Sequence, residues 1–221
     1  EITKFNVSSL KLDECREFVD WYGQRTGVQR DLGALTIENP LLVQFMFELA
    51  QGISISSFAK RFKKRLIILS LFEATKTILA TNALYIDAPY SILSSNENRD
   101  ALERLCEEDQ LHFRIVLQSD IASVVGIRLA HPHLAWLLFT EWIEPPATLS
   151  KSWARELSKV MSLLESDKSI TSIHNMLYRL LTTEHLGSPG EFTSSMPKAE
   201  RDEFLVELYR LHNEQHEGNP S

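Results

Sequence analysis

Two short segments carry the residue types that could do chemistry. His131 and His133 flank Pro132 at a predicted strand-to-helix junction, where an imidazole and free backbone N–H groups can meet an anion. Packing of one histidine and capping of the turn by the other would explain the same residues. A metal site needs further ligands, which the sequence does not mark. The second segment is the basic run at residues 60–65, which could contact phosphate or form a solvated helix face.

The signatures of common enzyme classes are missing from the sequence. No glycine is followed by lysine, so there is no P-loop, and no dinucleotide-binding, zinc-protease, C-x-x-C or G-x-S-x-G motif occurs. Cys15 and Cys106 fall inside predicted helices and are expected to be reduced, half-buried thiols. We therefore expect no catalytic activity and no metal in this chain.

Composition indicates a water-soluble protein with one or more real cores. The chain has 221 residues, 43% of them hydrophobic, and a net charge of -7. An acidic chain repels nucleic acid unless its basic residues are concentrated locally. The apolar runs at residues 66–72 and 134–139 are far shorter than the ~20 residues of a membrane span, and no signal peptide precedes them. We expect a cytoplasmic location, and a start at Glu1 with a polar tail suggests a piece of a longer protein.

Hydrophobic periodicity predicts a mainly helical chain with one β-hairpin. Helices are expected at residues 11–22, with Ser9 as cap, and at 41–51, begun by Pro40 and ended by Gly52. A third helix is expected at 66–80, a turn at 87–89, a short helix at 90–93, a polar loop at 94–98 and a helix at 99–107. Alternation then predicts strands at 111–117 and 124–129, joined by a loop at 118–123, as the only regular β structure. Pro132 opens an apolar helix at 134–143.

The order of these elements favours a helical lid, a winged-helix domain and the start of an α-solenoid. The boundaries are expected at 1–62, 63–145 and 146–221, with a proline linker at 144–147. The C-terminal part is predicted to hold antiparallel helices at 151–165, 170–182 and 198–213, with a loop at 187–197. The presumed recognition helix, residues 99–109, has an acidic surplus, which indicates a protein-packing role and not DNA binding.

Three stretches resemble the region that follows the ATPase core in STAND-class NTPases, AAA+-related switch proteins that include NOD-like receptors, the apoptosome scaffold and prokaryotic antiviral sensors. Residues 7–14, followed by Phe18 and Trp21, resemble the opening of the helical lid. Residues 38–42 resemble the G-x-P motif, and residues 129–134 resemble the MHD motif of the winged helix. The resemblance covers about residues 5–143. It departs from the family at Glu38, in place of Gly, and at Pro132, in place of Asp.

The resemblance implies a non-catalytic regulatory fragment of a nucleotide switch. Pro40 would then lie near the adenine ring and His131 near the phosphates of ATP or ADP, held mainly by an upstream ATPase domain of the same protein. The expected partners are that domain and proteins bound by the C-terminal helices, with no specific DNA and no membrane. This chain alone is expected to hold no nucleotide. The alternatives are a winged-helix nucleic-acid-binding regulator that uses residues 60–65, and a helical protein-interaction adaptor.

Overall fold

The computed structural model describes residues 9–109, 111, 113–117, 124–129, 131–143, 149–166 and 198–217. The chain divides into two compact units, Glu1–Arg65 and Leu66–Ser221. Each unit is described by itself. The division falls inside helix α3 (Ile55–Ile68).

The first unit is helical in its described residues and has an apolar core. It contains α1 (Leu12–Thr26), the 3-10 turn η1 (Leu32–Ala34), α2 (Leu42–Gln51) and the start of α3. One cluster of buried residues comes from α1, α2 and the segments beside them: Leu10, Cys15, Val19, Leu35, Phe45 and Leu49. Phe47, Phe58 and Phe62 of α2 and α3 are also buried. The helical spacing of the cluster residues in the sequence gives α1 and α2 one apolar face each, and burial of these faces drives the packing.

The ends of these helices differ in detail from the predictions. The Lys11 N–H donates to the Glu14 carboxylate at 2.7 Å, so Lys11 and not Ser9 precedes α1. Gly27 ends α1, and Gly52 ends α2 with φ of 74°, as a helix-ending glycine does. Pro40 lies ahead of Leu41, the residue that precedes α2, so the expectation that Pro40 begins the helix is wrong.

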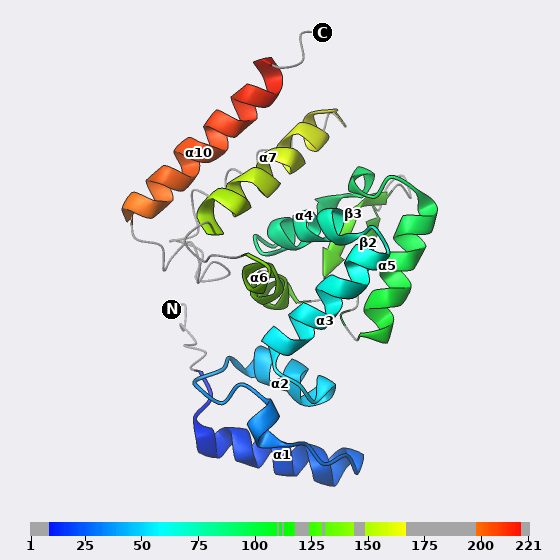
Figure 1. Cartoon of the computed structure of the whole chain (residues 1–221), viewed down its shortest axis with the longest axis vertical. Coiled ribbons are helices and arrows are strands. Elements are labelled where there is room, and N and C mark those ends of the chain that lie inside the picture. Colours follow the sequence, from blue (N-terminus) through cyan, green and yellow to red (C-terminus); the bar gives the residue numbers. More distant parts are fainter. Residues whose placement is uncertain are drawn as a thin grey trace, which may run out of the picture. The chain divides into compact units, whose positions relative to one another are not determined.

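The second unit combines helices with a small sheet (Figure 1). Its elements are α4 (Phe72–Asn82), β1 (Ala88–Pro89), η2 (Tyr90–Ile92), α5 (Asn96–Glu108), β2 (Phe113–Leu117), β3 (Val124–Leu129), α6 (Pro132–Glu141), α7 (Leu149–Ser166) and α10 (Lys198–Glu217). Helix α4 contacts α6, α7, β1 and β3, and α7 lies beside α10. The expectation of a mainly helical chain with an antiparallel hairpin is therefore confirmed.

The sheet has the strand order β1-β3-β2, and all neighbours are antiparallel. Gly126 of β3 lies opposite Pro89 on one side and Val116 on the other. A Cβ atom on Gly126 would lie 2.6 Å from the Ala88 carbonyl oxygen, so the close approach of β1 requires glycine there. Pro89 is tolerated because β1 is an edge strand.

The predicted strands at 111–117 and 124–129 correspond to β2 and β3, although β2 begins at Phe113. The expectation that this hairpin is the only regular β structure is wrong, because β1 also pairs with β3. A strand of two residues has no alternating pattern to detect, and it was predicted as a turn. The sheet still has fewer than four strands among the described residues, and no helix passes through Phe113.

The predicted third helix at residues 66–80 is confirmed over residues 72–80, which lie in α4, but its predicted start is wrong. Helix α3 continues to Ile68, and α4 begins only at Phe72. Ser70 lies between them with a positive φ of 56°, and the Leu71 N–H donates to the Leu66 carbonyl at 2.8 Å. This tight turn redirects the chain inside an apolar segment whose only polar residue is Ser70. Helix α5 likewise begins earlier than predicted, at Asn96, because the Ser95 side chain caps it.

The structure describes only some of the segments predicted for the C-terminal part of the chain. Helices predicted at 151–165 and 198–213 correspond to α7 and α10. The loop at 118–123, the linker at 144–147, the helix at 170–182 and the loop at 187–197 lie outside the described residues. The division into three domains and the solenoid therefore stay predictions. None of the helices in the described ranges has the length and apolar character needed to cross a membrane.

Candidate functional site

His131 lies at the junction between β3 and α6, as the sequence predicted. It is the residue before α6, it is exposed, and its imidazole makes no capping hydrogen bond to the helix. Pro132 occupies the first turn, where a missing N–H does no harm. The His131 carbonyl accepts hydrogen bonds from Leu134 N at 3.1 Å and Ala135 N at 3.3 Å. The imidazole is therefore available to a ligand, whereas the Leu134 N–H in the first turn is already used.

The surroundings of His131 favour its neutral form. Desolvation lowers the pKa of this imidazole below its ordinary value of 6.5. A neutral imidazole keeps one N–H donor and one acceptor. At neutral pH His131 can therefore donate a hydrogen bond to an anionic oxygen, but it does not carry a positive charge to attract one.

Asn82 positions the strand that leads to His131, and the sequence analysis missed it. This buried residue ends α4, and its Oδ1 accepts from Leu129 N, the last residue of β3, at 2.7 Å. Its Nδ2 donates to the carbonyls of Ile86 at 2.9 Å and Ile127 at 3.1 Å. One amide thus fixes β3 against α4 just before the junction. The only sequence signal was a polar residue closing an apolar helix.

Pro40, the other predicted ligand, is buried in the first unit. Its carbonyl accepts from Leu10 N at 2.8 Å, and Asn39 before it has a positive φ of 48°. These contacts fix the chain ahead of α2. Pro40 and His131 belong to different units, so their predicted convergence on one cleft stays a prediction.

A fully buried carboxylate in the first unit was also missed. Glu48 of α2 accepts from Thr36 N at 2.6 Å, Thr36 Oγ1 at 2.8 Å, Gln44 Nε2 at 3.0 Å and Ile55 N at 2.8 Å. These bonds tie the segment before Pro40 and the first residue of α3 to α2. Since its oxygens are occupied by structural donors, Glu48 serves the fold and is not placed for acid–base chemistry.

The basic run at residues 60–65 lies on α3. Phe62 is buried, whereas Lys60 and Lys64 are exposed. Arg61 donates to the Gln51 side chain at 3.2 Å, and its guanidinium lies 5.1 Å from the centre of the Phe58 ring. This arrangement is that of an amphipathic helix with a solvated basic face.

The surface of α5 is acidic because its exposed carboxylates outnumber Arg104, its one exposed arginine. Arg99 lies 3.7 Å from the centre of the Tyr90 ring and donates to the Leu93 carbonyl at 3.2 Å. Arg104 donates to the Asp100 carbonyl of the same helix at 3.2 Å. The carboxylates of Glu97, Asp100 and Glu107 are exposed.

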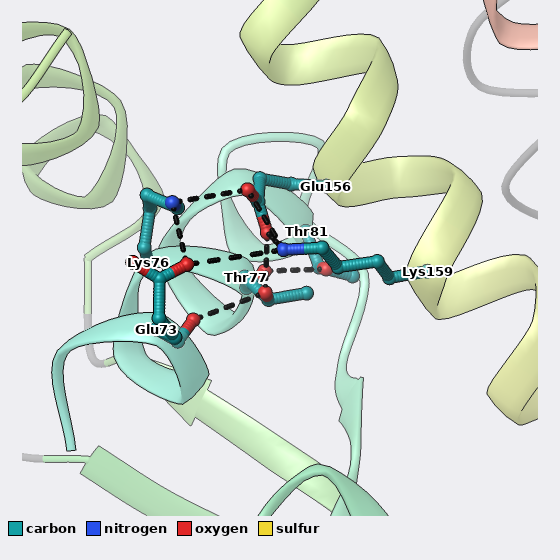
Figure 2. A network of polar contacts seen from close by, with 6 residues as sticks. All are labelled: Glu73, Lys76, Thr77, Thr81, Glu156 and Lys159. Atoms are coloured by element: carbon teal, nitrogen blue, oxygen red, sulfur yellow. Dashed lines mark hydrogen bonds and ion pairs between the residues drawn. The ribbon is translucent and has the colours of Figure 1, made fainter. Parts of the chain in front are cut away.

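A charged cluster joins α4 to α7 (Figure 2). Its centre is Glu156, whose side chain is 2% exposed. This carboxylate accepts from Thr77 Oγ1 at 2.6 Å and from Lys159 Nζ at 2.9 Å, and it lies 3.3 Å from Lys76 Nζ. Glu73 accepts from Lys76 Nζ at 2.7 Å. We call Glu73, Lys76, Thr77, Glu156 and Lys159 the charged cluster.

The acidic residues of the charged cluster keep Lys76 protonated. Burial by itself would lower the pKa of Lys76, but the hydrogen bond to Glu73 and the attraction of Glu156 raise it above 10.5. Lys76 therefore stays protonated at neutral pH and compensates the buried carboxylate. No local sequence pattern indicates the Thr77–Glu156 contact, because 79 residues separate the two positions.

The described residues contain no group of three or more His, Cys, Asp or Glu side chains that could hold a metal ion. Comparison with known proteins adds no relative: no family model, no curated protein and no solved structure matches the chain.

Proposed function

We propose that this chain is a non-catalytic regulatory fragment of a STAND-type nucleotide switch, which couples the nucleotide state of an ATPase domain to a C-terminal sensor. The observation that supports the proposal most directly is the exposed, uncapped position of His131. Its imidazole is exposed at a strand-to-helix junction and makes no capping bond, and Asn82 fixes the strand before it. The resemblance of residues 129–134 to the MHD motif gives this imidazole a ligand, the phosphate of ATP or ADP.

The second unit supports the winged-helix part of the proposal. Helix α5 is followed by the hairpin β2–β3 and by α6, and β1 adds a short third strand to the hairpin. The side-by-side packing of α7 and α10 is what the first helices of an α-solenoid need. The buried Trp153 of α7 stacks on Phe204 of α10 with ring centres 4.8 Å apart.

In this proposal, the nucleotide supplies phosphate oxygens that can accept a hydrogen bond from His131. The neutral imidazole donates its N–H, and the junction holds it in place between β3 and α6. Such a contact would stabilise one of two arrangements of the second unit against the ATPase domain. A differential contact of a few kcal/mol is enough to shift a population of this kind.

The nucleic-acid alternative is disfavoured by charge. A recognition helix should present a basic surface to DNA, whereas α5 presents Glu97, Asp100 and Glu107 against one exposed arginine, Arg104. We expect no more than non-specific binding of duplex DNA, with Kd on the order of 10⁻⁴ to 10⁻⁶ M at physiological salt. Nanomolar, sequence-dependent binding in a mobility-shift assay would overturn the proposal.

The decisive experiment compares His131→Asn with His131→Leu in the full-length protein that contains the ATPase domain. Asparagine keeps an N–H donor, whereas leucine keeps bulk and loses the donor. We expect His131→Leu to change the rate of nucleotide release, and His131→Asn to change it less. Thermal unfolding of both variants should stay close to that of the parent, because the imidazole is exposed. Equal nucleotide release in both variants and the parent would refute the phosphate contact, and the adaptor reading would then be preferred.

A further inference from the structure

Helix α7 is attached differently to its two main neighbours in the second unit, α10 and α4; it also contacts β1 and, through the rings of Trp153 and Trp136, helix α6. Toward α10 the contact contains the stacked rings of Trp153 and Phe204, both buried. Toward α4 it contains the charged cluster and the hydrogen bond from Trp153 Nε1 to the Ala80 carbonyl at 2.9 Å. Apolar stacking thus connects α7 to α10, and polar bonds form an important part of its contact with α4.

The charged cluster has equal numbers of acidic and basic groups, and it lies at the edge of the interface. Glu156 is buried, but the side chains of Glu73 and Lys159 are 68% and 38% exposed. A buried carboxylate loses much of its hydration, and its ion pairs compensate for that loss only when every partner is in place. When α7 moves away from α4, all four charged groups become fully hydrated again. Hydration therefore lowers the free energy of the separated state, which it does not do for an apolar interface.

Thr77 contributes a hydrogen bond to Glu156 only while α7 is packed against α4, which we call the closed state. Its single hydroxyl hydrogen has two acceptors within reach, the Glu156 carboxylate at 2.6 Å and the Glu73 carbonyl of its own helix at 3.1 Å. In the closed state the nearer, charged acceptor is favoured. In an open state the hydroxyl can turn back to the Glu73 carbonyl, so Thr77 keeps a hydrogen bond when α7 leaves, whereas the Ala80 carbonyl loses its bond from Trp153.

We propose that the charged cluster is a latch, from which α7 and α10 open together while α4, α6 and the sheet remain folded. The opening would separate Glu156 from Lys76 and Thr77, and it would break the hydrogen bond from Trp153 to Ala80 and the ring contact between Trp153 and Trp136. The proposal concerns the chain itself and does not rest on the response of His131 to nucleotide.

Amide hydrogen exchange on the whole 221-residue chain tests the latch without any nucleotide. We expect the slowest amides of α7 and α10 to exchange through one shared opening, at least about tenfold more often than those of α4 and β3. If the slowest amides of all four elements exchange at one common rate, α7 opens only when the unit unfolds, and the latch is refuted.

Variants of the cluster sharpen the test. Glu156→Gln removes the charge that both lysines neutralise, and it should speed exchange in α7 and α10 by about tenfold or more while α4 and β3 stay unchanged. The combined change Lys76→Met, Glu156→Leu and Lys159→Met replaces three of the four charges with apolar groups and leaves only the exposed Glu73, and it should slow that exchange. Glu107→Gln, at an exposed position of α5, is the matched control and should change neither.

Thr77→Val provides a milder variant that keeps the shape of the side chain if Glu156→Gln does not fold. It removes the hydrogen bond to Glu156 and should raise exchange in α7 and α10 alone. Equal acceleration in α4 and β3 would show a general loss of stability and would overturn the latch.

Discussion

Replacement of Asn82 by alanine should destabilise the second unit more than any exposed substitution. The side chain serves three backbone groups, the carbonyls of Ile86 and Ile127 and the N–H of Leu129, and all three residues are buried. An unpaired buried polar group costs about 1–3 kcal/mol. Three such groups, with partial relaxation, give a loss of about 3–6 kcal/mol, against a stability of about 5–15 kcal/mol for a typical domain.

The loss is measured by urea unfolding followed through tryptophan fluorescence, since Trp136, Trp142 and Trp153 all lie in the second unit. With an m-value of about 2 kcal/mol/M, the midpoint should fall by about 1.5 M or more. Asn98→Ala, which removes one exposed hydrogen bond to Ser94, is the matched control and should cost under about 1 kcal/mol. A loss under about 1 kcal/mol for Asn82→Ala would show that the amide does not hold β3 against α4.

Three further predictions concern single residues. Gly126→Ala should lower stability by about 1–3 kcal/mol, because its Cβ would meet the Ala88 carbonyl oxygen at 2.6 Å; an unchanged melting temperature would contradict this close approach. Glu48→Ala should cost about 3 kcal/mol or more in urea unfolding, since it leaves the Ile55 N–H without its acceptor, and a neutral effect would mean that water replaces the carboxylate. Because the pKa of His131 is lowered in the folded chain, the unfolded chain binds a proton at this imidazole more readily, and stability should fall as the pH drops below about 6.5. His131→Asn should reduce this pH dependence. Identical pH profiles of unfolding for the variant and the parent would refute the lowered pKa.

The sequence predicted the elements whose side chains repeat at regular intervals. The apolar residues of α1 and α2 recur at helical spacing, and the alternation of Phe113 and Ile115 with polar neighbours marks β2. The junction at His131 could be predicted because Pro132 favours the first turn of a helix. These features depend on the local preferences of neighbouring residues, which can be recognised in a single sequence.

The missed features depend on contacts between distant segments. The turn at Ser70 interrupts an apolar run that contains neither glycine nor proline, so no helix-breaking residue predicts the turn. Strand β1 exists because Gly126 lets the Ala88 backbone approach. The contacts of Asn82 with Leu129 and of Thr77 with Glu156 join helices to partners that only the folded chain brings near. The role of Asn82 beside β3 and the charged cluster around Glu156 can therefore be recognised only in the folded chain.

Pro89 has a consequence for the behaviour of the protein in concentrated solution. An open sheet edge offers N–H and C=O groups on which a strand of another molecule can pair, and such pairing begins many aggregates. The β1 edge is only two residues long, and one of them is a proline without an N–H. This edge of the sheet is therefore a poor template for intermolecular strand addition, and a side chain at residue 89 that restores the N–H would make it a better one.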